Sequence, residues 1–363
     1  MFISIHMKIK ALEFKIENLK LTKPYRIAFK TVDFVENLFC IIRFDNDILG
    51  FGSCNPENEV AFISRSKSIN RLEALDQDML KNISIENDPM PLIQQLYSMI
   101  GDVPTIHAML EMAIWDAFAK HLDKPLLTIW GKKIDPLSTS VTIGIMDTIE
   151  TLDETAKFLK AGFDHIKIKI GLNPEEDAER IKKLLEKYGH QIILRADINQ
   201  GYTLEEYKRF ILLTKELPIE LHEQPLRRDQ FSQIDILDAN EKSIIAADES
   251  LLNIDDALAI THYHRCGILN IKIMKCGGWL QARQIGALGL ENYIDLMWGC
   301  NDESRISIAA AMTMAYASAN TRYLDLDGSF DLAYDPALRG FDVKNGKLIP
   351  LDSPGLGIDL DFI

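Results

Sequence analysis

HIKIKIG, residues 165–171, places Lys167 and Lys169 two positions apart among three isoleucines. In an extended strand the side chains of residues i and i+2 point to the same face, so the lysines share one face and the isoleucines share the other. Taken alone, this pattern is typical of a half-exposed strand whose lysines lie in water. The strands on either side decide whether the lysines are solvated or face a buried site.

Seven more short runs rich in β-branched residues accompany this strand, and amphipathic helical segments separate them. The repeat of 25 to 30 residues predicts βα units around a parallel sheet. Eight strands with seven intervening helices fit a barrel better than an open doubly wound sheet, and no strand is followed by GxGxxG or by a GxxxxGKS/T loop. The predicted strands are SVTIGI (140–145), HIKIKI (165–170), QIILRADIN (191–199), PIELHEQP (218–225), SIIAADES (243–250), ILNIKIMK (268–275), YIDLMWGC (293–300) and RYLDLDG (322–328).

The last predicted strand leads into a loop-rich tail, residues 329–363, instead of an eighth helix. The fold class predicted for residues 133–328 is therefore α/β, a modified TIM barrel of the (β/α)7β type. Residues 1–132 follow a different pattern, because MKIKALEFKIENLKL (7–21) and ENLFCIIRFDN (36–46) indicate an antiparallel sheet and HAMLEMAIWDAFAKHL (107–122) indicates a helix. This part is predicted to be a separate α+β unit.

The composition excludes several function classes. A formal net charge of −14 disfavours nucleic acid as a partner, because such affinity comes largely from clustered Lys and Arg. No run of eighteen apolar residues and no secretory signal is present, which argues against membranes and predicts a cytoplasmic protein. The five scattered cysteines fit reduced thiols. Met1 and Met7 are both possible starts, since MKIKALEFKI already resembles a first strand.

Three consecutive predicted strands end in a carboxylate: RADIN with Asp197, HEQP with Glu223 and ADES with Asp248. The intervals of 26 and 25 residues are one βα unit each, so the three side chains should converge at the C-terminal end of the barrel, where active sites of this fold lie. Each acid alone could cap the following helix. Three in register repel one another unless a cation lies among them, and oxygen ligands favour Mg²⁺ over zinc.

Lysines flank these acids on two sides. Lys167 and Lys169 lie on the preceding strand, and Lys272 lies across the barrel in NIKIMK, whereas Lys275 has the other strand parity and is expected to be solvated or to pack along its stem. A metal ion between two inward lysines suits removal of a proton α to a carboxylate. We expect the neighbouring ammonium, the metal ion and burial to lower the pKa of the lysine that acts as base.

At KIK (167–169), RADIN, HEQP, ADES and NIKIMKCGG (270–278), the sequence resembles the enolase superfamily, in particular its muconate-lactonizing subgroup. The resemblance covers essentially the whole chain and implies that residues 1–132 form a capping domain, completed by the tail 329–363. It implies Mg²⁺ as cofactor and assigns the following roles: Asp197, Glu223 and Asp248 as metal ligands, Lys169 and Lys272 as acid/base groups on opposite faces of the substrate, Lys167 as electrostatic partner of Lys169, and Asn199 and Gln224 as supporting groups.

Within this subgroup, RYLDLDG resembles the Asp-x-Asp element with which dipeptide epimerases hold the substrate ammonium, here Asp325 and Asp327. A solvated Asp-Gly turn is the alternative. Thr142 matches a substrate-contacting position. In the loop KPYRIAFKT (23–31), Lys30, with Arg26 as a substitute, matches the cation that meets a distal carboxylate in L-Ala-D/L-Glu epimerases. The loop GCNDES, with Asn301 and Asp302, departs from the pattern: if Asp302 lines the pocket, it would repel a glutamyl side chain and favour a polar or cationic one.

The resulting prediction is a Mg²⁺-dependent dipeptide epimerase that inverts the C-terminal residue of an L,L-dipeptide, with L-Ala-L-Glu as the first candidate. The alternatives are an N-acylamino acid racemase, an o-succinylbenzoate synthase and a catalytically silent barrel that acts as a binding protein. The expected partners are a small dipeptide and further copies of the chain in a homo-oligomer, with neither nucleic acid nor membrane.

Overall fold

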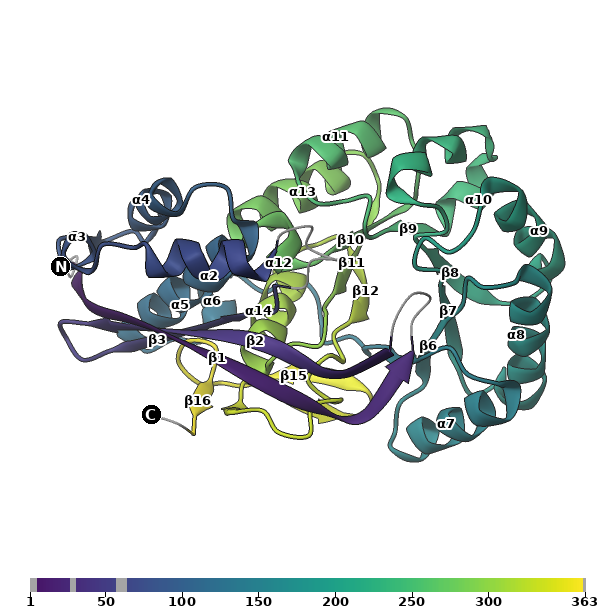
Figure 1. Cartoon of the computed structure of the whole chain (residues 1–363), viewed down its shortest axis with the longest axis horizontal. Helices are drawn as coiled ribbons and strands as arrows, with labels where there is room; N and C mark the ends of the chain where they lie inside the picture. The colour runs from purple at the N-terminus through teal and green to yellow at the C-terminus, as the bar shows by residue number, and fades with distance from the viewer. Residues whose placement is uncertain (1–4, 27–30, 57–63, 362–363) are drawn as a thin grey trace.

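The computed structural model describes residues 5–26, 31–56 and 64–361 of the 363-residue chain. An N-terminal unit built on an antiparallel sheet lies beside a barrel whose helices form the opposite side of the molecule (Figure 1). Within the described residues, no helix is long and apolar enough to cross a membrane.

The barrel is a single sheet of eight strands in the order β12-β11-β10-β9-β8-β7-β6-β5, and all its paired strands are parallel. Contacts of Thr139 and Ser140 with Leu324 bring the two edges together. The predicted modified TIM barrel is therefore confirmed. Its strands are β5 (Val141–Ile143), β6 (His165–Lys169), β7 (Ile193–Asp197), β8 (Ile219–Glu223), β9 (Ile245–Ala247), β10 (Ile268–Ile271), β11 (Asp295–Gly299) and β12 (Thr321–Asp325).

Helices surround this sheet, and their first residues carry ordinary capping signals. The Asn173 side chain, for example, accepts hydrogen bonds from the main-chain N–H groups of Glu175 and Glu176, both at 3.0 Å, and so caps α8. The elements around the barrel are α7 (Thr148–Lys160), α8 (Pro174–Tyr188), α9 (Leu204–Thr214), η1 (Arg228–Ile236), α10 (Ala239–Ser243), α11 (Ile254–His262), α12 (Ile273–Cys276), α13 (Trp279–Glu291) and α14 (Arg305–Tyr316).

One strand prediction is wrong in its extent. The run 268–275 is extended only to Ile271, and α12 begins two residues later. Lys272 still has an extended backbone, but Lys275 belongs to a helical turn. Strand parity therefore does not apply to Lys275.

The alternation of side chains separates the barrel interior from the helical shell. Ile166 and Ile168 are buried in the main hydrophobic core, toward the helices. A small apolar cluster that includes Leu221 and Met297 fills the barrel interior below the C-terminal ends of the strands, and Tyr323 packs against this cluster. Because this plug occupies the lower part of the barrel, the polar inward residues gather above it at the C-terminal ends of the strands.

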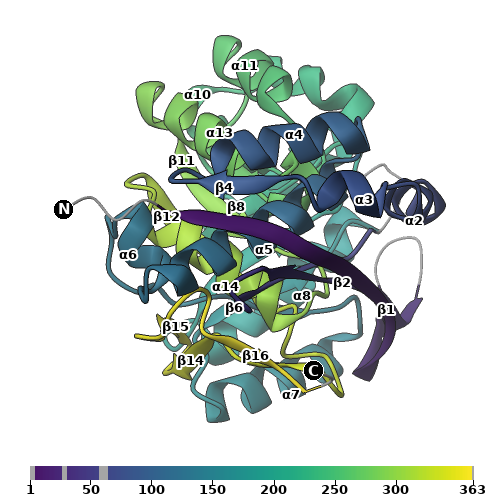
Figure 2. The ribbon, with the colours of Figure 1, turned by 90° about the vertical axis from the view of Figure 1, so that its left-hand side faces the viewer.

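The N-terminal unit contains a four-stranded sheet in the order β3-β2-β1-β4. Figure 2 shows the long strand β1 of this sheet. The sheet lies very close to α5, because a Cβ on Gly50 or Gly52 would stand 1.9 Å from a carbonyl oxygen of that helix. The elements are β1 (His6–Arg26), β2 (Thr31–Phe44), β3 (Leu49–Cys54), α2 (Arg65–Glu73), α3 (Gln77–Leu80), β4 (Ser84–Glu86), α4 (Met90–Ile100), α5 (Pro104–His121) and α6 (Leu126–Trp130).

The C-terminal segment returns to the N-terminal unit. The main-chain N–H of Thr22 donates to Asp331 O at 2.7 Å, and the N–H of Leu356 donates to the buried carboxylate of Asp116 in α5, also at 2.7 Å. The segment thus joins the end of β1 to the last strand of the barrel. Its strands are β13 (Ala337–Arg339), β14 (Phe341–Lys344), β15 (Lys347–Pro350) and β16 (Ile358–Leu360).

Glu111 connects α5 to the barrel. Its fully buried carboxyl group lies 2.7 Å from the Tyr97 hydroxyl oxygen and accepts a hydrogen bond from the N–H of Leu280, in the first turn of α13, at 3.2 Å. Burial raises the pKa of Glu111 to about 7. The folded state therefore favours the neutral acid at this contact.

This raised pKa predicts a pH-dependent contribution to stability. The contribution is fully present below the ordinary pKa of 4.5 and is lost as the pH rises toward 7, because the folded protein binds the proton more tightly than the unfolded chain. Glu111→Gln mimics the neutral acid at every pH. The unfolding free energy of the native protein relative to this variant should fall by about 2 kcal/mol between pH 5 and pH 8 in urea titrations. An equal pH dependence of both proteins would contradict the assignment.

Candidate active site

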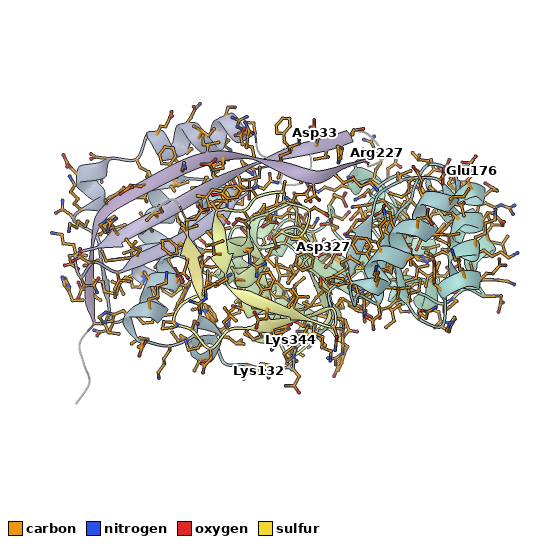
Figure 3. The ribbon with its side chains drawn as sticks, turned by 90° about the horizontal axis from the view of Figure 1, so that it is seen from below. Asp33, Lys132, Glu176, Arg227, Asp327 and Lys344 are labelled. Atoms are coloured by element: carbon orange, nitrogen blue, oxygen red, sulfur yellow. The ribbon has the colours of Figure 1, made fainter. Side chains whose placement is uncertain are left out.

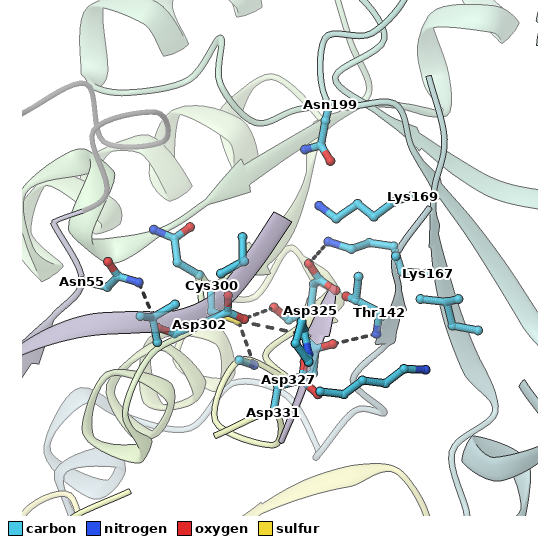
Figure 4. A pocket seen from close by; sticks show the side chains of 18 of the residues that line it. Asn55, Thr142, Lys167, Lys169, Asn199, Cys300, Asp302, Asp325, Asp327 and Asp331 are labelled. Carbon is cyan, nitrogen blue, oxygen red and sulfur yellow. Dashed lines mark hydrogen bonds and ion pairs between the residues drawn. The ribbon is translucent and has the colours of Figure 1, made fainter. Parts of the chain in front are cut away.

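A cavity opens at the C-terminal ends of the barrel strands, between the barrel and the N-terminal unit (Figure 4). Its lining combines apolar residues, such as Val32 and Phe158, with lysines and carboxylates. Figure 3 places Asp327 in the interior, whereas Glu176 lies on the outer helices. The predicted residues that line the cavity are Lys167, Lys169, Lys272, Asp248, Thr142, Asn199, Asp302, Asp325 and Asp327.

Lys167 lies at the centre of the buried charges. Its ammonium group contacts the carboxylate of Asp325 and stands 3.5 Å from those of Asp197 and Glu223. Burial opposes the charged form, but these carboxylates outweigh it and hold the pKa of Lys167 well above its ordinary value. The lysine is only 4% exposed, so the half-exposed strand is ruled out.

Each of the two lysines predicted to act as acid/base groups pairs with a predicted metal ligand. Lys169 Nζ donates to Asp197 Oδ2 at 2.7 Å, and Lys272 Nζ donates to Asp248 Oδ2 at 2.8 Å. Burial again opposes the charge on Lys272, yet Asp248 and Glu223 raise its pKa above the ordinary value. At Lys272 the carboxylates thus outweigh burial and favour the charged ammonium group.

Asp248 is held from several directions. Its main-chain N–H donates to Gln224 Oε1 at 3.0 Å. Lys275 Nζ donates to the Asp248 main-chain oxygen at 2.6 Å and also contacts Oδ1. The expectation that Lys275 is solvated is therefore wrong: its side chain is fully buried, because α12 turns it toward β9.

The three acids Asp197, Glu223 and Asp248 carry the oxygen donors that Mg²⁺ prefers. Asp197 pairs in register with Glu223, which pairs with Ala246 on the next strand. Among the described residues, no three His, Cys, Asp or Glu side chains stand close enough to hold a metal ion in their present conformations. Burial and Asp197 raise the pKa of Glu223 to about 8, which indicates more negative charge than the lysines balance. The donor chemistry therefore fits a divalent cation.

Asp325 and Asp327 differ in the groups of the protein with which each carboxylate is paired. Asp325 contacts Lys167 and accepts from the Ser140 hydroxyl at 2.6 Å, and although burial opposes it, Lys167 lowers the pKa of Asp325. Asp327 accepts from the N–H of Thr142 at 2.7 Å, and burial together with Asp325 raises its pKa to about 6. At 2% exposure Asp325 is not a solvated turn residue.

Further acids line the outer part of the cavity. Asp331 is largely buried, and burial with the charges of Asp327, Asp302 and Glu154 raises its pKa to about 7. Glu154, in α7, pairs with Lys23 of β1 at 2.7 Å, so the N-terminal unit contacts the barrel at this point. We call Glu154, Asp302 and Asp331 the rim acids.

The N-terminal unit also positions the loop that carries Asp302. The side-chain amides of Asn37 and Asn55 donate to the main-chain oxygen of Asp302 at 3.3 and 3.0 Å. Lys30 lies outside the described residues, and of Arg26 only the backbone, at the end of β1, is described. The structure therefore places neither predicted cation.

Sequence reasoning missed several residues of the site. Asn270 donates to Glu223 Oε1 at 2.9 Å, and a Cβ on Gly299 would stand 2.6 Å from Asn270 Oδ1 and 3.1 Å from Lys272 Cε. Strand parity could have identified Asn270, which precedes Lys272 by two residues. Glu249, whose Oε2 has no hydrogen-bond partner among the described residues, and Asp331 carried no signal beyond their charge.

The fold and this arrangement of lysines and carboxylates define an enzyme of the α/β barrel class. Residues 150–362 match the family model described as Enolase C-terminal domain-like, and the chain belongs to that family. It is 41% identical over 353 residues to the L-Lys-D/L-Arg epimerase of Desulforapulum autotrophicum, covering 97% of this chain and 99% of the relative. It is 42% identical over 357 residues to the L-Lys-D/L-Arg epimerase of Methylococcus capsulatus, with the same coverage.

A solved structure supports the same relationship. The dipeptide epimerase from Methylococcus capsulatus complexed with Mg and the dipeptide L-Arg-D-Lys superposes with a TM-score of 0.92 at 41% identity. The match covers 97% of this chain and 99% of that chain.

The central position of Lys167 predicts a large effect on stability. Lys167→Met would leave three buried carboxylates without their shared cation, and loss of one partner of a buried ion pair costs about 3–5 kcal/mol. We expect a loss of this size in urea unfolding at pH 8, and a smaller loss at pH 5, where the acids with raised pKa are protonated.

The matched control is Lys157→Met, which removes an exposed lysine that pairs with Glu154 at 2.8 Å. Exposed pairs contribute at most about 1 kcal/mol. Equal losses in the two variants would show that Lys167 does not compensate a buried cluster.

Proposed function

We propose that the protein is a Mg²⁺-dependent dipeptide epimerase that inverts the α-carbon of the C-terminal residue of a cationic dipeptide by a 1,1-proton transfer. The observation that carries the proposal is the position of Lys169 and Lys272. They extend from β6 and from the end of β10, which are four strands apart in an eight-stranded barrel and so lie on opposite sides. One lysine can remove a proton from one face of a carbon atom while the other returns a proton to the opposite face.

The remaining charges fit the demands of this reaction. Asp197, Glu223 and Asp248 would hold Mg²⁺, whose charge stabilises the substrate carboxylate as an enediolate forms. Lys167 stays an ammonium group, since the surrounding carboxylates raise its pKa, and provides a fixed positive charge next to that carboxylate. Lys169 forms an ion pair with Asp197, and Lys272 forms one with Asp248. A lysine must lose its proton before it acts as a base.

A substrate ammonium group explains the acids at the end of β12. The pKa of Asp327 is about 6, and no lysine among the described residues forms an ion pair with it, whereas Asp325 already contacts Lys167. Asp327 can therefore accept a further cation. The N-terminal ammonium of a dipeptide supplies such a cation. N-acylamino acids and o-succinylbenzoate precursors lack it, so the pair favours a dipeptide over both alternatives.

The rim acids favour cationic side chains on that dipeptide. Burial raises the pKa of Asp331 most, and the charges of Asp327, Asp302 and Glu154 raise it further, so a cationic side chain beside Asp331 would favour its ionised form. An L-Ala-L-Glu substrate would add further negative charge. The names of the two relatives at 41% and 42% identity, L-Lys-D/L-Arg epimerase, agree with the charge of the cavity. We therefore replace the first candidate, L-Ala-L-Glu, by Lys- and Arg-containing dipeptides.

The reaction is tested by incubating L,L-dipeptides that contain Lys, Arg, Ala or Glu with the protein and Mg²⁺ in deuterated water. We expect deuterium at the α-carbon of the C-terminal residue, read by mass spectrometry, and the highest rates with Lys and Arg. Lys169→Ala and Lys272→Ala should each lower the epimerisation rate by roughly 10²–10⁴-fold, because each loses one proton-transfer group. Each variant should retain exchange on one epimer alone. Epimerisation at the native rate by either variant would exclude the two-base scheme.

The side-chain preference is tested with Asp331→Asn. We expect KM for a Lys-containing dipeptide to rise roughly tenfold, about 1.4 kcal/mol, while KM for L-Ala-L-Ala stays constant. In the native protein, KM for the cationic dipeptide should fall between pH 6 and pH 8, since a cation binds the ionised carboxylate whose pKa is about 7. The variant should show a weaker pH dependence.

The control is Asp352→Asn, which makes the same charge change at an exposed position that does not line the cavity. Parallel changes in KM for charged and uncharged dipeptides in Asp331→Asn would contradict a role in charge selection.

A further inference from the structure

Lys275 is a buried lysine that does not line the active-site cavity. Its ammonium group donates to the main-chain oxygen of Asp248 at 2.6 Å and contacts Oδ1 of the same residue. A buried ammonium group is costly unless it is paired and hydrogen-bonded. In the described part of the chain, the side-chain hydrogen bonds of Lys275 all go to Asp248, and the charge of Glu249 also interacts with it.

The polar atoms of Asp248 divide into two sets. The main-chain N–H donates to Gln224 Oε1 at 3.0 Å, and the main-chain oxygen accepts from Lys275 and from the N–H of Leu251 at 3.0 Å. Oδ1 faces Lys275, whereas Oδ2 accepts from Lys272, which lines the cavity, at 2.8 Å. Only Oδ2 is therefore paired with a group of the cavity.

The local chain geometry explains how Lys275 reaches this position. The strand β10 ends at Ile271, and the N–H of Lys275 donates to Lys272 O at 3.0 Å, so one helical turn brings Lys275 back beside β9. Gly277 ends the turn in the left-handed conformation, with φ 90° and ψ 30°. The Tyr97 hydroxyl donates to Gly277 O at 2.8 Å, which holds the turn against the N-terminal unit.

We propose that Lys275 is a positioning residue that holds Asp248 by Oδ1 and by its main-chain oxygen, so that Oδ2 alone is presented to the metal ion. The inference rests on the proposed function, because it assumes that Asp248 binds Mg²⁺. Groups that orient a metal ligand in this way typically contribute 10- to 100-fold to metal affinity.

Charge alone predicts the opposite effect. Loss of a positive charge beside Asp248 would tighten Mg²⁺ binding, since a nearby ammonium group repels the metal ion. Loss of positioning would weaken binding, since Asp248 could then rotate. The direction of the change in Mg²⁺ affinity therefore separates the two roles.

The test is Lys275→Met, which keeps a side chain of similar length without charge or donors. In isothermal titration calorimetry with MgCl₂, we expect its dissociation constant to be about 10- to 100-fold higher than that of the native protein. Lys275→Gln, whose amide can reach only one of the two acceptors, should lie between the two. If Lys275→Met does not fold, the Gln variant decides the question alone.

The matched control is Lys120→Met. Lys120 Nζ also donates to one main-chain oxygen, that of Leu49 at 3.0 Å, and to one carboxylate, that of Asp116 at 2.6 Å, but it lies in α5 away from the cavity. We expect it to leave Mg²⁺ affinity unchanged. Unchanged or tighter Mg²⁺ binding in the Lys275 variants, or an equal loss in Lys120→Met, would overturn the inference. Failure of the native protein to bind Mg²⁺ would instead refute the proposed function.

Discussion

The charge balance at the mouth of the barrel is the constraint on which the rest of the site depends. Six carboxylates and four lysines gather there, which leaves an excess of two negative charges when all are ionised. Burial, together with the neighbouring carboxylates, raises the pKa of three of the acids, to about 8 for Glu223, about 7 for Glu249 and about 6 for Asp327. Entry of a divalent cation would remove this excess, so burial of the acids and affinity for Mg²⁺ have one physical origin. The groups are Asp197, Glu223, Asp248, Glu249, Asp325 and Asp327 with Lys167, Lys169, Lys272 and Lys275.

Such a cluster needs a frame that resists relaxation, because mobile side chains would let the charges separate into water. The parallel strands provide it by fixing Lys169 opposite Asp197 and Asp197 opposite Glu223 in register. The N-terminal unit adds a second support: Asn37 and Asn55 hold the loop of Asp302, and Tyr97 holds the turn after Lys275. The unit therefore shapes the loops that complete the site as well as covering it.

The part of the site that the sequence could predict is the part that follows a strict period. The eight strands and the three acids recur at intervals of one βα unit, and alternation along HIKIKI correctly turns the lysines inward. The prediction fails at Lys275, because parity holds only while the chain is extended and the chain becomes helical after Lys272. Asp331 lies beyond the last strand, where no period places it, and its raised pKa arises first from burial and then from the charges of Asp327, Asp302 and Glu154.

The carboxylates around Lys167 and the rim acids lie at two levels of the cavity and have different partners. At the level of Lys167, the acids pair with lysines of the chain itself, and these lysines include the two proposed to transfer protons. At the rim, burial and the charges of Asp327, Asp302 and Glu154 raise the pKa of Asp331, so a cation on the substrate would favour its ionised form. Substitutions at the rim can therefore change the preferred side chain without disturbing the lysines below. On the proposed function, the same lysines could therefore act on dipeptides of different charge, because only the outer electrostatic balance would have to change.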